Sequence, residues 1–131
     1  MFSYQQLTGF WIGPDNSIWE QGYSGSGESK DNPVDENLVG KGPIPTGNYK
    51  IVGPPIDTAN HGPCVLRLIP DELTRAAIID LGRDPDSFLI HGDSIEHPGA
   101  ASEGCIILSR ATREKIWSVN ATDADLTVVA I

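Results

Sequence analysis

The chain has 131 residues, close to the common size of one domain, so we expect a single domain over residues 1–131. Its apolar fraction of 39%, with 14 glycines and 10 prolines, is typical of a turn-rich globular protein and favours a mainly β fold with a few short helices. The net charge of −9 argues against nucleic acid as a partner, and the lack of any apolar run near the roughly 18–20 residues of a membrane-spanning helix argues against membrane insertion.

Short apolar runs and turn residues alternate at the start of the chain. Phe10–Ile12 and Ser17–Glu20 flank a Gly-Pro-Asp-Asn turn, which predicts a β-hairpin with Trp11 and Trp19 in the core or on a sheet face. The Gly/Ser-rich stretch 22–32 predicts a surface loop. Further strands are predicted at residues 49–52, 64–69, 87–90, 105–108 and 126–131.

Two helices are expected. Helix-forming residues fill 71–81, after Pro70-Asp71, and Gly82 is well placed to end this helix. Ser109 is a suitable N-cap for a second helix that runs to about Val119.

A cysteine and a histidine are the candidates for chemistry. Two cysteines, Cys64 and Cys105, could form one disulfide, but a small secreted scaffold usually carries more, so we expect at least one thiol to have another purpose. A nucleophilic thiol needs a base, since its ordinary pKa of about 8.5 leaves it mostly protonated at neutral pH. The candidate bases are His61, His91 and His97. His91 ends one buried strand and Cys105 begins another, and two adjacent strands would bring them together.

The residues around this pair leave alternatives open. Gly104 lacks a Cβ, so it either lets a substrate carbonyl approach an oxyanion hole of backbone N–H groups or is a turn glycine before a core strand. Ser102 either hydrogen-bonds within the loop or contacts substrate. Asp93 either positions the loop or the imidazole, or lies in an exposed turn. We expect the cleft to be bordered by the loop Ser94–Ala101.

The run His91-Gly92-Asp93, followed after a loop by Ala101-Ser102-Glu103-Gly104-Cys105-Ile106, resembles the signature of the L,D-transpeptidase (YkuD-like) family. The upstream segments Gly42-Pro43-Ile44-Pro45 and Tyr23-Ser24-Gly25 are similar to a compact subgroup, the L,D-transpeptidase-like toxins of type VI secretion. The resemblance spans about Tyr23 to Lys115. It implies an L,D-transpeptidase-like β-sandwich catalytic domain that needs no cofactor and no metal.

The resemblance also implies roles for individual residues. Cys105 would be the nucleophile and His91 the base, as a thiolate–imidazolium pair, with the Gly92 carbonyl orienting the imidazole. The N–H groups of Gly104 and Cys105 would hold the oxyanion. Tyr23 and Ser24 would line the cleft, and Ser102 and Asp93 are further candidates for substrate binding.

The implied reaction takes place on peptidoglycan stem peptides. The thiolate attacks the carbonyl between the third stem residue, usually diaminopimelate, and the fourth, D-alanine, to form a thioester. Water, the amine of a second stem or a D-amino acid then resolves it, which corresponds to carboxypeptidase, cross-linking or exchange activity.

The chain departs from the family pattern at two positions. Glu103 stands where many members have a second histidine, and a nearby carboxylate disfavours thiolate. Ile107 stands where the wider family often has an arginine. Arg67, Arg83 and Arg110 are the alternative candidates for binding the substrate carboxylate.

The resemblance implies an antibacterial effector made in the bacterial cytoplasm without a signal peptide. It would pass through a secretion apparatus to the periplasm of a target cell and be neutralised in the producing cell by an immunity protein. One alternative is a noncatalytic peptidoglycan-binding or partner-binding domain. Another is a metal-binding module that uses His61 and Cys64, with further ligands from His91, His97 and Cys105. The simplest interpretation of His61 and Cys64 is a turn histidine and a buried thiol.

Overall fold

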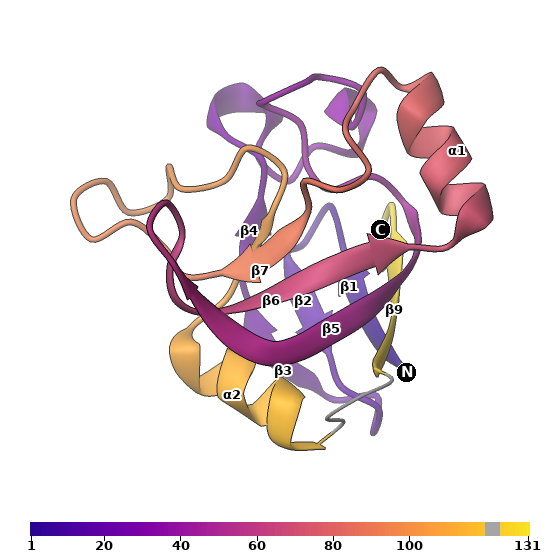
Figure 1. Cartoon of the computed structure of the whole chain (residues 1–131). Coiled ribbons are helices and arrows are strands. Elements are labelled where there is room, and N and C mark those ends of the chain that lie inside the picture. Colours follow the sequence, from indigo (N-terminus) through magenta and orange to yellow (C-terminus); the bar gives the residue numbers. More distant parts are fainter. Residues whose placement is uncertain (120–123) are drawn as a thin grey trace.

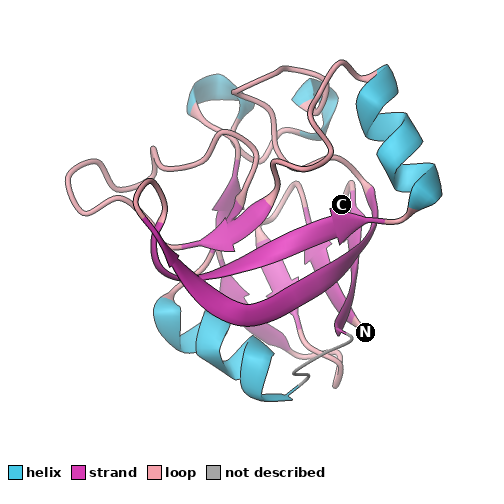
Figure 2. Cartoon of the chain, viewed as in Figure 1, coloured by secondary structure: helices cyan, strands magenta, loops and turns pink. Residues whose placement is uncertain are grey.

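The computed structural model describes residues 1–119 and 124–131, and in this part of the chain two α-helices pack against one mixed nine-stranded sheet (Figure 1). Strands dominate the fold and helices are few (Figure 2), as predicted. The strands are β1 (Phe2–Gln5), β2 (Phe10–Ile12), β3 (Ile18–Gln21), β4 (Tyr23–Ser24), β5 (Gly47–Thr58), β6 (Gly62–Pro70), β7 (Leu89–His91), β8 (Ile106–Ile107) and β9 (Ala124–Val129). The helices are α1 (Glu72–Asp80) and α2 (Arg110–Val119), with 3-10 turns η1 (Gly27–Ser29) and η2 (Pro33–Asp35).

The sheet curls until its two edges meet. Its strand order is β3-β2-β1-β9-β5-β6-β7-β8-β4, so β3 and β4 form opposite edges although only Gly22 separates them in the chain. A Cβ at Gly22 would collide with the carbonyl oxygen of Ile107 on β8, the strand next to β4, which is why glycine stands at this corner. The two layers expected of a β-sandwich are therefore parts of one continuous sheet.

The inward faces of the strands form the core. Tyr49 and Ile51 on β5 alternate with exposed or half-exposed neighbours, in the two-residue period of a strand with one buried face. Leu66 and Leu68 on β6 are likewise buried on either side of the exposed Arg67. The predicted tryptophans join this core. Trp11 is fully buried, and Trp19 packs edge-on against Phe2 with ring centroids 5.3 Å apart.

The two helices begin and end at the predicted signals. The Asp71 carboxylate accepts a hydrogen bond from the Thr74 N–H at 2.8 Å at the start of α1, and Gly82 follows its end with a φ of +79°. At the start of α2, Ser109 Oγ accepts from the Thr112 N–H at 3.3 Å. Neither helix of the described residues is long and apolar enough to cross a membrane.

Several strand boundaries differ from the sequence prediction. The stretch predicted as a loop contains β4, which pairs with β8, because buried hydrogen bonds of Ser24 replace an apolar pattern there. β5 continues far beyond residues 49–52, since irregular register between Val52 and Ile56 accommodates the Pro54-Pro55 pair. The strand β1, which was not predicted, pairs in parallel with β9 from the other end of the chain.

Candidate active site

Two parallel strands bring the candidate nucleophile and base together. β7 ends at His91 and Cys105 directly precedes β8, with Ile90 opposite Ile106 and His91 opposite Ile107. Ile90 and Ile106 are fully buried in the core. Because side chains alternate along a strand, His91 and Cys105 both project from the other face of this strand pair. β7 and β8 are therefore the two adjacent strands that the sequence predicts.

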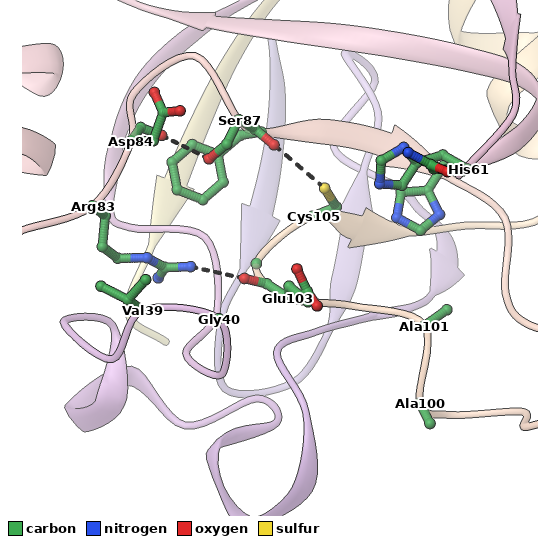
Figure 3. Close-up of a pocket in the computed structure, with 14 residues that line it drawn as sticks. Val39, Gly40, His61, Arg83, Asp84, Ser87, Ala100, Ala101, Glu103 and Cys105 are labelled. Carbon is green, nitrogen blue, oxygen red and sulfur yellow. Dashed lines mark hydrogen bonds between the residues drawn. The ribbon is translucent and has the colours of Figure 1, made fainter.

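A cavity of about 600 Å³ lies over this face and is lined by both His91 and Cys105 (Figure 3). Its volume is in the range of small-ligand pockets. Its other walls come from the loop at Val39 and Gly40, the β5–β6 turn, and the segment that precedes β7. Of the predicted bordering loop Ser94–Ala101, the residues Ala100 and Ala101 reach the cavity.

The Cys105 side chain is buried, which favours the protonated form of its thiol at neutral pH. Its side chain lies beneath the cavity surface, with Sγ 3.7 Å from the carbonyl oxygen of Ser87. The pKa of this thiol is raised to about 11, chiefly by burial and in smaller part by the negative charge of Glu103. The N–H of Leu89 and the guanidinium of Arg83 act in the opposite direction but do not offset the burial.

The imidazole of His91 is oriented by its own neighbour in the chain. Nδ1 lies 2.8 Å from the carbonyl oxygen of Gly92, and because a carbonyl can only accept, this contact assigns the proton of the neutral ring to Nδ1 and leaves Nε2 as the acceptor. Burial lowers the pKa of His91, and the charges of His61 and Arg113 lower it further. Together with the raised thiol pKa, this favours a neutral pair at rest, not the expected thiolate–imidazolium pair.

A second imidazole contacts His91. The ring of His61, from the turn between β5 and β6, lies with its centroid 4.7 Å from that of His91, and His61 also lines the cavity (Figure 3). The interpretation of His61 as a turn histidine is correct for its backbone but misses this contact. No local signal could have revealed it, because the two residues are far apart in the sequence and the hairpin must bend over the sheet to join them.

Gly104 makes room for a buried arginine. Its φ of +134° favours glycine, and a Cβ there would collide with Nη2 of Arg83 and lie 3.0 Å from the Phe88 ring. Arg83 is 6% exposed. Its Nη atoms donate to the carbonyl oxygens of Glu36 at 2.8 Å, Pro43 at 2.6 Å, Gly42 at 3.2 Å and Glu103 at 3.1 Å.

Ser102 braces the backbone around the nucleophile. Its Oγ donates to the carbonyl oxygen of Cys105 at 2.6 Å and accepts from the N–H of Gly25 at 2.9 Å and of Gly104 at 3.1 Å. Ser102 is 1% exposed, which favours the within-loop alternative over contact with substrate. Since the Gly104 N–H is already engaged, the Cys105 N–H is the remaining candidate for the oxyanion.

Ser24 has a similar buried position. Its Oγ donates to the carbonyl oxygen of Gly104 at 3.1 Å and accepts from the N–H of Ile44 at 2.8 Å. This bond ties the Gly-Pro-Ile-Pro segment to the loop of the nucleophile. We therefore assign Ser24 to positioning, whereas the resemblance placed it in the cleft.

Tyr23 and Asp93 hold the loop between the two candidate catalytic residues. The Tyr23 hydroxyl donates to Asp93 at 2.6 Å and accepts from the Ala101 N–H at 2.9 Å. Asp93 also accepts from the N–H groups of Ser94 and Gly99. Both residues lie beside the cavity and not in its wall. Of the two alternatives for Asp93, its hydrogen bonds favour positioning of the loop.

Of the three arginines considered for a substrate carboxylate, only Arg83 lines the cavity, and its Nη atoms are committed to backbone carbonyls. Arg67 is exposed on β6, and Arg110 pairs with Glu114 at 2.9 Å.

Cys64 and Cys105 are both free thiols. Within residues 1–119 and 124–131, no group of three or more histidines, cysteines or carboxylates is arranged to hold a metal.

Comparison with known proteins identifies the family of the chain. A search of curated proteins found no match. The model of one family, described as the Tlde1 domain, matches residues 19–130, which include β7, β8 and the entire cavity wall. The chain therefore belongs to the Tlde1 domain family, the L,D-transpeptidase-like effector domains of type VI secretion.

Proposed function

We propose that this chain is a cysteine-dependent L,D-transpeptidase or L,D-carboxypeptidase that acts on peptidoglycan tetrapeptide stems. The observation that carries the proposal is that Cys105 and His91 share one face of the β7–β8 pair in a cavity of about 600 Å³. The hydrogen bond of His91 to the Gly92 carbonyl supports a role as base, because it leaves Nε2 free to accept a proton. Membership of the effector family supports peptidoglycan as the substrate.

The neutral resting pair suggests the order of proton transfers. The Cys105 proton passes to Nε2 of His91 as Sγ attacks the carbonyl carbon between the third and fourth stem residues. The Cys105 N–H donates to the resulting oxyanion. When the tetrahedral intermediate collapses, the C–N bond breaks, His91 gives its proton to the departing amine of D-alanine, and a thioester on Cys105 remains.

The second half of the reaction reverses these transfers. Water or an amine attacks the thioester and passes a proton to His91, the C–S bond breaks, and the proton returns to Sγ. Charge on the pair is then transient, which fits a site where burial opposes both charged forms. Water yields a shortened stem, and an amine yields a cross-linked or exchanged one.

We also propose a setting for this activity. The chain would be made in the bacterial cytoplasm, pass through the secretion apparatus, and act on the cell wall in the periplasm of a target bacterium. An immunity protein would bind it in the producing cell. The support for both steps is membership of a family of type VI effectors.

The test is mass spectrometry of purified tetrapeptide muropeptides incubated with a D-amino acid and the wild-type chain, Cys105→Ala or His91→Ala. We expect loss or exchange of the terminal D-alanine with the wild type only, while circular dichroism shows both variants folded. Cys64→Ala is the matched control, since Cys64 lies on β6 outside the cavity, and it should retain most activity. No turnover by any folded chain, with a dimeric acceptor also tried, would favour a noncatalytic binding domain.

A further inference from the structure

Glu103 carries an inference about the second half of the proposed reaction, and it rests on that proposed function. We infer that the Glu103 carboxylate binds the ammonium group of an amine acceptor beside the thioester on Cys105. The site would then favour transfer to cationic amines, such as the amino group of a D-amino acid or of a stem peptide, over hydrolysis.

The backbone of Glu103 is firmly held at the cavity. Its carbonyl oxygen accepts from Arg83 at 3.1 Å, and the next two residues are braced by Ser102. Glu103 lines the same cavity as Cys105, and its side chain is exposed there (Figure 3). The held backbone keeps Glu103 in the wall of the cavity that Cys105 also lines, and its exposed side chain is open to a ligand that enters from solvent.

No cation within the described part of the chain neutralises this carboxylate. The ion pairs in this part of the chain are Lys50–Asp125, Arg75–Asp86 and Arg110–Glu114. None of these residues lines the cavity. The nearby guanidinium of Arg83 donates to the Glu103 carbonyl and not to its carboxylate. Glu103 therefore presents an uncompensated negative charge beside the candidate nucleophile.

That charge opposes the first half of the reaction, because it raises the pKa of the Cys105 thiol. An ammonium group bound to Glu103 removes this penalty and also brings the acceptor nitrogen close to the reacting sulfur. Hydrolysis gains nothing from the carboxylate in the same way, since water carries no charge. The carboxylate thus distinguishes the two acceptors.

The transfer step balances as follows. The bound R–NH₃⁺ first loses one proton through Glu103 to solvent and becomes R–NH₂. Its nitrogen attacks the thioester carbon, the C–N bond forms, and the C–S bond breaks. The second proton lost by nitrogen passes to His91 and from there to Sγ, which restores the starting thiol and imidazole.

The experiment measures how the thioester partitions. Wild type, Glu103→Gln and Glu103→Lys are each incubated with a tetrapeptide muropeptide and D-methionine, and the ratio of exchanged to hydrolysed product is determined by mass spectrometry. Glu96→Gln is the matched control, because it removes the same charge from an exposed residue of the neighbouring loop that does not line the cavity. Hydroxylamine, a largely neutral nucleophile at pH 7, serves as a second acceptor.

We expect the exchange ratio to fall roughly three- to fivefold in Glu103→Gln, the range of an exposed charge pair, and further in Glu103→Lys. Glu96→Gln should keep the wild-type ratio, and the ratio of hydroxylamine product to hydrolysis should stay constant in all chains. An unchanged exchange ratio in Glu103→Gln, an equal fall with hydroxylamine, or hydrolysis alone in the wild type would overturn the inference. If the wild type forms no thioester on Cys105, the proposed function itself fails.

Discussion

The protonation state of Cys105 is open to a direct test by alkylation across a pH range. In a Cys64→Ala background, Cys105 is the sole thiol of the chain. With a pKa of about 11, its thiolate fraction at pH 8 is about one in a thousand, compared with about one in four for an ordinary thiol of pKa about 8.5. The thiolate is the reactive form, so alkylation should be slower by roughly two hundredfold from protonation alone.

The assay follows iodoacetamide addition by intact mass between pH 6 and pH 10, with circular dichroism to show that the chain remains folded. Burial slows access by a factor that does not depend on pH, so the slope of the rate is more informative than its absolute value. We expect the rate to rise about tenfold per pH unit throughout this range. A plateau already reached near pH 7, and abolished by His91→Ala, would refute the reasoning and establish a resting thiolate–imidazolium pair.

Three further substitutions test the supporting structure. Gly104→Ala should lower the free energy of unfolding by about 3 kcal/mol in urea titrations, because it adds a Cβ at a φ of +134° and displaces the guanidinium of Arg83. Tyr23→Phe removes the hydroxyl that donates to Asp93 and accepts from the Ala101 N–H. It should therefore lower the free energy of unfolding by about 1 kcal/mol and speed proteolysis of the loop between these two residues. His61→Ala should expose the neighbouring imidazole to water and raise its lowered pKa, so that activity is lost at a higher pH on acidification; the pH profile of D-alanine release measures this.

Controls separate these effects from general damage. Gly82→Ala also places a side chain at a positive φ, of +79°, but in open space, so it should cost less than Gly104→Ala. Equal losses at the two glycines would show that contact with Arg83 contributes nothing. Wild-type proteolysis of Tyr23→Phe would contradict the loop-holding role, and an acidic limb unmoved in His61→Ala would contradict shielding by that ring.

Local signals in the sequence were sufficient for the regular elements whose ends depend on their own residues. Asp71, Gly82 and Ser109 set the helix limits through short-range capping bonds, and the hairpin around residues 13–16 follows from its turn residues. The strand β1 could not be predicted in this way. Its four residues gain their partners from β9, at the other end of the chain, through a parallel pairing with no local mark.

The candidate site, too, could be predicted from local sequence only in part. His91 and Cys105 could be singled out because each borders a short apolar run, and the motif around them placed the chain in its family. Their common face, the cavity over it and the engagement of Gly104 and Ser102 in buried hydrogen bonds depend on how β7, β8 and β4 pair. Pairing of strands that are distant in sequence is decided by the whole sheet, so these features were open until the sheet was known.

Residue types and their order in the chain were thus enough to indicate the family and to single out Cys105 and His91 as the candidate nucleophile and base. The lowered pKa of His91 and the raised pKa of Cys105, the contact of His61 with His91, and the hydrogen bonds by which Arg83 ties together the segments around Gly104 depend on tertiary structure alone. The physical reason is that burial, ring contacts and buried hydrogen bonds arise from groups far apart in the chain. Their energies exist only when the curled sheet has brought those groups within a few ångströms of one another.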